Sequence, residues 1–466
     1  MIAHARRGRF ARNSQAERIR AATERAASFS HGVDRVHPLA EAALSAGLRR
    51  RVEAIEAAFA TGGGAGRDEA EAQFRSQLAA ASVLGTFCRL VERGFDRDLA
   101  HSSDGESAEA LIRRWGFHAV DITPCADGRL SGVVDYILRV PPAIVAFRKS
   151  YAGAMFDVEE SVAHWESVEL RRWREARPNA AAEPTRYLKI GVYHFSGGDP
   201  AHQGCAAHGH DAARAAAAVL QRLEQFAGAV EATHCCGATV ATLLVGVDTD
   251  DDAIRVHVPD AHGRASAERY LDNHELYALT RDLPREAAKD AIRDAVARSA
   301  GVAVDDAGSE GMRWFCGYLL KNNIGQVDAV RQWHGGAYAD RGHTERLIVV
   351  GDALDDVQVR NLFFQAQMNT VEEGGADLDI GVRILRGLHE PRGSAVPVLV
   401  HVNFDPRIPG AEARARRRAA RLREAIATRY AGLAARGLLH VQAVVRGGAG
   451  APLVRVDPLT ATESFA

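Results

Sequence analysis

RYLKIGVYH, residues 186–194, is a short run of apolar and β-branched side chains that ends in a histidine. A run of this length and composition predicts a buried β-strand. Helical stretches such as 212–232 lie between it and other apolar runs that we also predict as strands, at 119–123, 242–247, 254–258, 347–352 and 397–405. Strands that alternate with helices predict an α/β fold.

Two of these strands end beside residues that can bind a metal. Sites in α/β sheets collect at the carboxyl ends of strands, where strand 119–123 leads to Cys125 and strand 186–194 ends in His194. Thiolates and imidazole select zinc, and three protein ligands leave a fourth position open for water. The candidate ligands are Cys125, His194, Cys205 and the adjacent pair Cys235 and Cys236 with His234.

Cys125 differs from the other cysteines because of the residues that follow it. Asp127 and Arg129 lie two positions apart with a glycine between them. A carboxylate paired with a guanidinium stays ionised and accepts hydrogen bonds in a fixed direction, so this pair could orient a water on a metal. A lone cysteine is more often a small buried apolar residue, which is our interpretation of Cys88 and Cys316.

The composition is that of an ordinary globular protein with several domains. The chain has 466 residues, of which 47% are hydrophobic and 25% charged, as in typical soluble domains. Its formal net charge of -2 argues against a nucleic-acid binder, and no apolar run is long enough to span a membrane. Six cysteines in so long a chain do not form a disulfide framework, which fits a reducing cytoplasm.

Changes in composition divide the chain into four segments. Residues 1–35 are predicted to be a basic, flexible tail, and 36–102 a helical domain with apolar residues at three- and four-residue spacing. Residues 103–345 hold the candidate ligands. In 346–466, Val402-Asn403-Phe404 near the end of a predicted strand echoes Tyr193-His194-Phe195, which suggests a degenerate repeat in which Asn403 replaces the histidine and Gly351-Asp352 stands near the place of Cys125. A chance echo between short apolar strands is the alternative.

Six separated motifs occur in an order that resembles a known family. From Gly116 onward the chain is similar to the carboxysome shell carbonic anhydrases, a divergent branch of the β-class formerly called the ε-class. The motifs are GFHAVDITPCADGRL at 116–130, YLKI to HFS within 187–196, GCAAHG at 204–209, HCCGA at 234–238, GVDTD at 246–250 and SEGMR at 309–313.

The resemblance implies a fold and a set of site residues. It implies a helical N-terminal domain, a β-carbonic-anhydrase-like α/β catalytic domain and a degenerate second copy that lacks zinc. It assigns the zinc ligands to Cys125, His194 and Cys205, and the catalytic pair to Asp127 and Arg129. Asp127 would then orient the reacting water, while Arg129 keeps Asp127 ionised and away from the metal.

The function that the resemblance implies is the zinc-dependent, reversible hydration of CO2 to bicarbonate inside a carboxysome of the bacterial cytoplasm, which supplies CO2 to Rubisco. Two thiolates offset the charge of Zn²⁺, so we expect activity to favour higher pH. We expect a homo-oligomer, a dimer or higher. Contacts with carboxysome shell proteins, with Rubisco or with both are expected through the basic N-terminus.

Two other functions are weighed against this one. A zinc nucleobase deaminase needs a His-x-Glu and a Pro-Cys-x-x-Cys, but Pro124-Cys125 has no partner cysteine and no His-x-Glu precedes it. The alternative is a non-catalytic shell or docking protein that zinc merely stabilises. The Asp127–Arg129 pair argues against that alternative, because a structural zinc site needs no orienting carboxylate.

Overall fold

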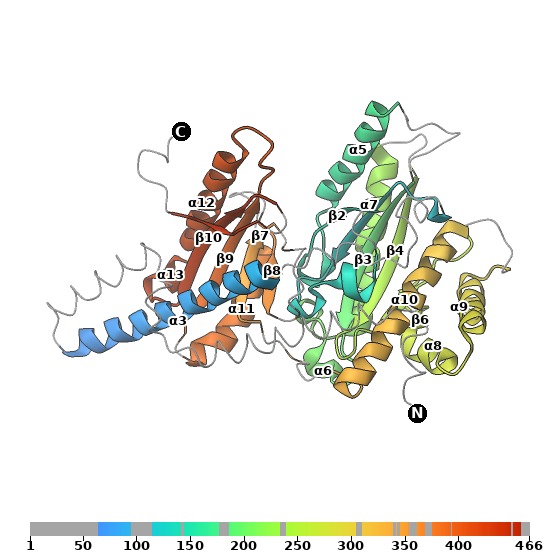
Figure 1. Cartoon of the computed structure of the whole chain (residues 1–466), viewed down its shortest axis with the longest axis horizontal. Coiled ribbons are helices and arrows are strands. Elements are labelled where there is room, and N and C mark those ends of the chain that lie inside the picture. Colours follow the sequence, from blue (N-terminus) through green and yellow to red (C-terminus); the bar gives the residue numbers. More distant parts are fainter. Residues whose placement is uncertain are drawn as a thin grey trace. The chain divides into compact units, whose positions relative to one another are not determined.

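The computed structural model describes two compact units, each built on one β-sheet (Figure 1). The first unit includes residues 98–343, and the second includes 344–466 together with 22–97. The described residues are 64–94, 114–140, 144–176, 186–233, 239–303, 310–338, 342, 345–352, 354, 360, 362–368, 375–392, 394–448 and 451–457. The predicted basic tail, most of the first half of the predicted helical domain, and His234, Cys235 and Cys236 lie outside them.

The sheet of the first unit has the strand order β2-β1-β3-β4-β5-β6. The first four strands in this order are parallel, whereas β5 and β6 are antiparallel to their neighbours. The strands are β1 (Ala119–Pro124), β2 (Val145–Arg148), β3 (Arg186–Phe195), β4 (Thr239–Asp248), β5 (Ile254–His257) and β6 (Leu271–Asp272). The carboxyl ends of β1, β3 and β4 therefore meet at one edge of the sheet.

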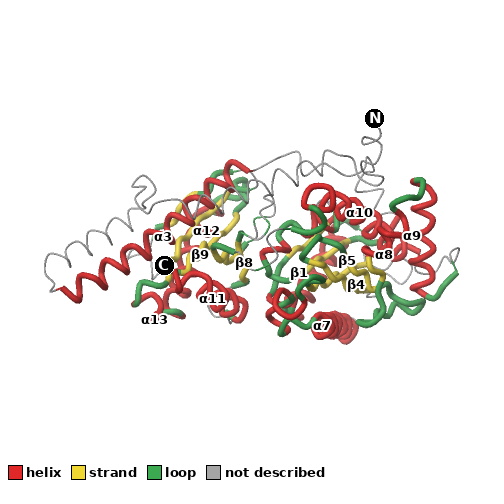
Figure 2. The backbone as a smooth tube through the Cα atoms, turned by 90° about the horizontal axis from the view of Figure 1, so that it is seen from below, coloured by secondary structure: helices red, strands yellow, loops and turns green. Residues whose placement is uncertain are grey.

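Helices cover both faces of this sheet, with α7 on one face and α10 on the other (Figure 2). Helix α7 approaches closely because β3 carries Gly191, where a Cβ atom would lie 2.5 Å from Val219 Cγ1. The helices of the unit are α5 (Val158–Arg174), α6 (Pro200–Gln203), α7 (Ala212–Thr233), α8 (Asn273–Thr280), α9 (Arg285–Ala300) and α10 (Glu310–His334). Together they bury the sheet on both sides, as parallel sheets require.

A buried ion pair joins the neighbouring strands β1 and β3. Lys189 Nζ donates to Asp121 Oδ2 at 2.8 Å, and Tyr187 Oη donates to the same oxygen at 2.7 Å. All three side chains are buried. Since an unpaired charge at this depth would be strongly destabilising, the pair favours the observed register, in which Asp121 lies beside Lys189.

The second unit repeats the topology of the first. Its sheet has the order β11-β10-β9-β7-β8, so four parallel strands in the same sequence of positions are followed by an antiparallel edge strand. The elements are β7 (Leu347–Gly351), β8 (Phe363–Ala366), β9 (Val396–Asn403), β10 (Leu439–Arg446), β11 (Val454–Val456), α11 (Ala376–His389), α12 (Ala411–Arg429) and α13 (Ala431–Ala435). The shared strand order is expected if the two units are copies of one fold.

Matching hydrogen bonds align the two copies residue by residue. Cys125 N–H donates to Val192 O at 3.0 Å in the first unit, and Asp352 N–H donates to His401 O at 2.9 Å in the second. Asp352 thus takes the position of Cys125, and Asn403 takes that of His194. Within the described residues, both groups of side chains with metal-binding geometry lie in the first unit.

Helix α3 (Gly64–Gly94) packs in the second unit against β9 and β10. Gln77 Nε2 donates to Gly437 O at 2.7 Å and to Leu439 O at 3.0 Å, and Ser76 Oγ donates to Gly437 O at 3.1 Å. The helix begins inside the glycine run of residues 62–66. This helix belongs to the unit built around the C-terminal sheet. The division of the chain into four segments stays a prediction.

The predicted α/β fold is confirmed. The six predicted strands correspond to β1, β3, β4, β5, β7 and β9, and the predicted helix over 212–232 corresponds to α7. No helix among the described residues combines the length and apolar character needed to cross a lipid bilayer.

Candidate metal centre

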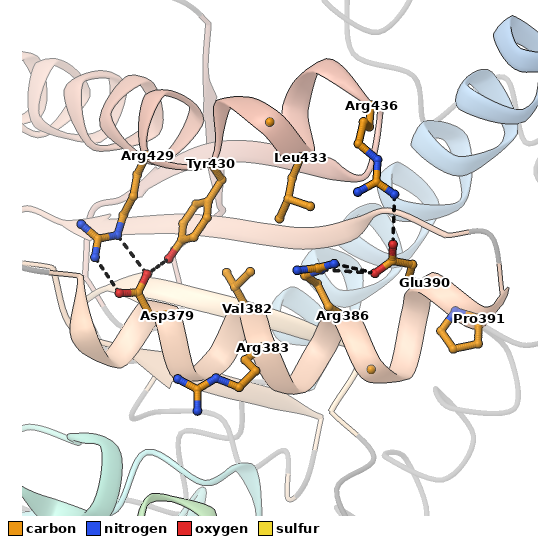
Figure 3. Close-up of a pocket in the computed structure, with 12 residues that line it drawn as sticks. Asp379, Val382, Arg383, Arg386, Glu390, Pro391, Arg429, Tyr430, Leu433 and Arg436 are labelled. Carbon is orange, nitrogen blue, oxygen red and sulfur yellow. Dashed lines mark hydrogen bonds and ion pairs between the residues drawn. The ribbon is translucent and has the colours of Figure 1, made fainter.

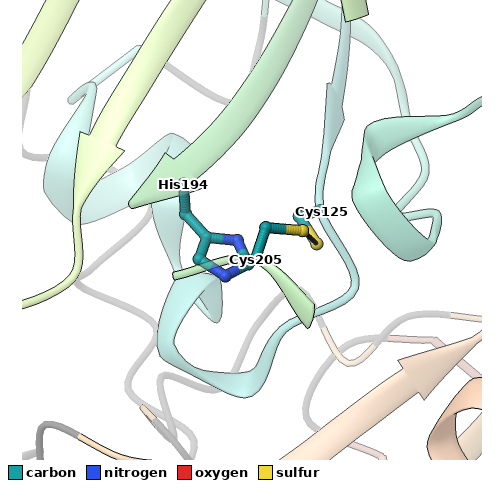
Figure 4. Close-up of side chains that lie close together, drawn as sticks. All are labelled: Cys125, His194 and Cys205. Carbon is teal, nitrogen blue, oxygen red and sulfur yellow. Dashed lines mark hydrogen bonds between the residues drawn. The ribbon is translucent and has the colours of Figure 1, made fainter. Parts of the chain in front are cut away.

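Two thiols and an imidazole converge at the carboxyl edge of the first sheet (Figure 4). Cys125 follows β1, His194 lies near the end of β3, and Cys205 follows the short helix α6. Their potential ligand atoms all lie within 4.8 Å of one another, and all three side chains are buried. The structure thus brings together three of the candidate ligands from segments up to 80 residues apart.

A glycine in a left-handed conformation closes the site around Cys125. Gly153 has φ +64°, and its N–H donates to Cys125 Sγ at 3.2 Å. A Cβ atom at this position would lie 2.5 Å from His208 Nε2, which donates to Gly153 O at 3.0 Å. Any other residue would be strained here and would also push His208 away. The backbone around Cys125 is therefore shaped to present the sulfur.

The donor set fits a tetrahedral zinc ion. Two sulfurs at a Zn–S distance of about 2.3 Å stand about 3.8 Å apart in a tetrahedral site, and Cys125 Sγ lies 3.9 Å from Cys205 Sγ. His194 Nδ1 is buried and has no hydrogen-bond partner among the described residues. A buried imidazole nitrogen without a partner is unusual in a protein interior, and two thiolates with an imidazole form a donor set that selects zinc.

The two sulfurs lie within hydrogen-bond distance of each other, at 3.9 Å. The hydrogen bond with Cys205, together with burial, raises the pKa of Cys125 well above its usual value, and the same contact lowers the pKa of Cys205. Burial lowers the pKa of His194, but the negative charges of Asp127 and Cys125 outweigh it and raise that pKa to about 9. Metal ligands must be deprotonated, so a cation that binds here displaces protons.

Asp127 and Arg129 form a buried, bidentate ion pair beside the three ligands. Arg129 Nε donates to Asp127 Oδ1 at 2.9 Å, and Nη2 donates to Oδ2 at 2.7 Å. Asp127 also caps the short 3₁₀ turn Gly128–Leu130 by accepting from Arg129 N–H. Burial raises the pKa of Asp127, but the guanidinium outweighs this and holds the pKa well below its usual range. The guanidinium thus favours the ionised form of the carboxylate.

The ion pair is linked to the metal-binding group by short contacts. Asp127 Oδ2 lies 3.2 Å from His194 Nε2, and Arg129 Nη2 lies 3.4 Å from the same nitrogen. On its other side, Arg129 Nη1 donates to Gln203 O at 2.8 Å and to Thr249 Oγ1 at 3.2 Å. The guanidinium therefore joins the loops that follow β1, α6 and β4.

Among the described residues, the other candidate cysteines and histidines are not members of the three-ligand group. Cys316 is buried in the apolar core and Cys88 is half-buried beside apolar side chains. His202 is exposed and lies 2.9 Å from Asp199, while His210 Nδ1 donates to Gly204 O at 3.0 Å. The roles of Cys235 and Cys236 fall outside the described residues.

A second group of side chains, Asp248, Asp251 and His274, also has metal-binding geometry. His274 Nε2 lies 2.8 Å from Asp251 Oδ2 and Nδ1 lies 3.3 Å from Asp272 Oδ1. The hydrogen bonds with Asp251 and Asp272 raise the pKa of His274 to about 10. A raised pKa favours the protonated imidazole, which cannot act as a metal ligand.

A groove of about 1180 Å³ in the second unit lies between α11 and the segment of α12 and α13 (Figure 3). Its two acids are already paired within the chain, Asp379 with Arg429 and Tyr430, and Glu390 with Arg386 and Arg436. The groove contains none of the predicted site residues, so the chemistry expected from the sequence lies in the first unit.

Comparison with known proteins gives matches over most of the chain. A family described as carboxysome shell carbonic anhydrase, catalytic domain, matches residues 107–343, and the C-terminal domain of the same family matches 344–458. The carboxysome shell carbonic anhydrase of Halothiobacillus neapolitanus is 47% identical over 365 residues, which cover 77% of this chain and 71% of that relative.

The carboxysome shell carbonic anhydrase of Hydrogenovibrio crunogenus is 42% identical over 369 residues, which cover 79% of this chain and 70% of that relative. These matches confirm the resemblance that the six ordered motifs indicated. Both the domain matches and the relatives lead to one conclusion: the chain belongs to the carboxysome shell carbonic anhydrase family.

Proposed function

We propose that this carbonic anhydrase of the carboxysome catalyses the reversible hydration of CO2 to bicarbonate with a zinc ion held by Cys125, His194 and Cys205. The observation that carries the proposal is the convergence of two thiols and one imidazole, with sulfurs 3.9 Å apart, next to a buried bidentate carboxylate–guanidinium pair. Three protein ligands leave one position for water, as in catalytic zinc sites.

Zinc at this site would supply an acidified water, and hence a nucleophile, near neutral pH. The three ligand residues set the charge of the site, because two thiolates balance the dication and the imidazole stays neutral. Such a site makes water less acidic than a site with three neutral ligands, so we expect activity to rise toward alkaline pH. The hydration of one CO2 consumes one water and yields one bicarbonate and one proton.

Asp127 and Arg129 are the proposed catalytic pair. Asp127 is an ionised acceptor at the edge of the ligand group, 3.2 Å from His194 Nε2, and can accept a hydrogen bond from the reacting water. That bond directs a lone pair of the water oxygen toward CO2. Arg129 contacts both carboxylate oxygens. It thereby keeps Asp127 ionised and resists rotation of the carboxylate onto the metal.

The direct test is the zinc content of the purified full chain, measured together with its rate of CO2 hydration by stopped flow. We expect about one zinc per chain, loss of the rate when a chelator removes the zinc, and recovery when zinc is returned. A chain that carries zinc but does not hydrate CO2 would favour the alternative, a zinc-stabilised shell or docking protein. A chain that hydrates CO2 without zinc would contradict the proposal.

The partners that we propose are carboxysome shell proteins, Rubisco or both, contacted through the basic N-terminus. Rubisco would use the CO2 that the enzyme releases. Four arginines precede the first acid, Glu17, in this segment, so it would suit an acidic surface. We also propose a homo-oligomer, a dimer or higher. Encapsulation of a chain without residues 1–30 at the level of the parent would contradict the N-terminal contact.

A further inference from the structure

We infer that Thr249 is a positioning residue for the reaction, which holds the guanidinium of Arg129 in the orientation that directs Asp127. The inference rests on the proposed role of the Asp127–Arg129 pair. Thr249 directly follows β4, and its side chain is completely buried. It lies on the side of the guanidinium that faces away from the carboxylate.

The hydroxyl proton of Thr249 takes part in a hydrogen bond to the backbone. Thr249 Oγ1 donates to Phe195 O at 3.1 Å, and Thr249 N–H donates to the same carbonyl at 2.8 Å. A hydroxyl has one proton and two lone pairs. With the proton directed at Phe195, a lone pair remains for Arg129 Nη1, which lies 3.2 Å away. Thr249 therefore acts toward Arg129 as an acceptor of fixed direction.

This acceptor lies at the end of the guanidinium that determines how the carboxylate is held. The pair with Asp127 uses Nε and Nη2, whereas Nη1 donates to Thr249 Oγ1 and Gln203 O. The guanidinium is planar and its five N–H groups form a rigid fork. Contacts at Nη1 therefore limit rotation of the whole plane, and with it the direction of both bonds to Asp127.

Thr249 also connects the guanidinium to the strand that carries a proposed ligand. Phe195, whose carbonyl receives both bonds from Thr249, directly follows His194 in β3. The chain of contacts runs from Asp127 through Arg129 and Thr249 to the backbone beside His194. The orientation of the carboxylate and the position of the imidazole therefore both depend on β3.

Valine in place of Thr249 removes the hydroxyl and keeps the side chain's shape. The N–H bond to Phe195 O remains, so the end of β4 stays attached to β3. A buried Arg129 N–H loses one acceptor, while Gln203 O stays in place. None of the three proposed zinc ligands is touched, so zinc content should not change although the carboxylate is less well oriented.

The experiment compares Thr249→Val, Thr249→Ser and Thr280→Val in the full zinc-loaded chain by stopped-flow CO2 hydration and zinc analysis. Thr280 is the matched control, since it is completely buried and its Oγ1 donates within its own helix to Leu276 O. We expect Thr249→Val to lower kcat about tenfold, with KM and zinc content unchanged. Thr249→Ser should return kcat to within about twofold of the parent, and Thr280→Val should match the parent.

A double-mutant cycle with Arg129→Lys separates positioning from general loosening of the core. If Thr249 acts through the guanidinium, adding Thr249→Val to Arg129→Lys should change kcat by less than about twofold. Additive effects in the cycle, a Thr249→Ser variant as slow as Thr249→Val, or a tenfold loss in Thr280→Val would each overturn the inference.

Asp127→Ala distinguishes failure of this inference from failure of the proposed function. If Asp127→Ala is inactive and Thr249→Val keeps the parent rate, only the role of Thr249 is wrong. If Asp127→Ala keeps the parent rate, the proposed pair is wrong, and the role of Thr249 is lost with it.

Discussion

Cys125→Ser should release zinc and abolish CO2 hydration. A serine hydroxyl stays protonated near neutral pH and is a poor zinc ligand, whereas a thiolate binds zinc at about 2.3 Å. The variant would leave Cys205 and His194 as the only ligands of the proposed set. Because the metal is what makes water nucleophilic near neutral pH, we expect at least a 1000-fold loss of rate, on the order of magnitude that metal activation provides.

The matched control is Cys316→Ser, the same change at a buried cysteine elsewhere in the first unit. Cys316 lies in the apolar core, where burial raises the pKa of its thiol to about 12. It should keep its zinc and its rate of CO2 hydration, with some loss of stability from a buried hydroxyl. Stopped-flow rates and metal analysis decide the comparison. If Cys125→Ser hydrates CO2 as fast as the parent, the assigned site is wrong.

Asp127→Ala should keep its zinc and lose most of its turnover. The substitution removes the ionised acceptor that we propose for the reacting water but leaves the three ligands in place. Positioned groups of this kind contribute about 100- to 10,000-fold to a rate, so we expect kcat to fall at least about 100-fold. It also leaves Arg129 buried without its carboxylate, which costs about 3–5 kcal/mol of stability for a fully buried pair.

Asp127→Asn separates the loss of turnover from the loss of stability. Asparagine keeps the shape and one acceptor oxygen but has no negative charge, so the variant should unfold at a higher temperature than Asp127→Ala. Its turnover should nevertheless stay well below that of the parent. Thermal unfolding, zinc content and kcat are measured on the same preparations. Loss of zinc from a folded Asp127→Asn chain would show that Asp127 supports metal binding and not only the reaction.

The fold could be predicted from the sequence because the longer strands of both sheets are buried and mostly apolar. The run that ends in His194 was predicted as a strand over residues 186–194 and is β3, Arg186–Phe195. Short strands gave no comparable signal. Val145–Arg148, for example, is only four residues long and half-buried throughout, and it was not predicted. The repeat was visible only as an echo until matching hydrogen bonds aligned Asp352 with Cys125.

The site could be predicted only in part from the sequence itself. The pattern Cys125-x-Asp127-x-Arg129 is local, so its chemistry could be read directly. Cys205 joins Cys125 across 80 residues of chain, and no local pattern encodes that contact, so the choice among the cysteines depended on the family resemblance. Gln203 contributes a backbone carbonyl, which has no sequence signature. Thr249 appeared only as one residue of the GVDTD motif at 246–250, and its contacts with Arg129 and Phe195 single it out.

The segment that leads to Cys205 contributes to both parts of the site. Gln203 supplies a carbonyl to Arg129, and two residues later Cys205 supplies a sulfur to the ligand group. The backbone between them is short, so a displacement that withdraws one group also withdraws the other. Docking of this segment would therefore complete zinc capture and carboxylate alignment in a single step.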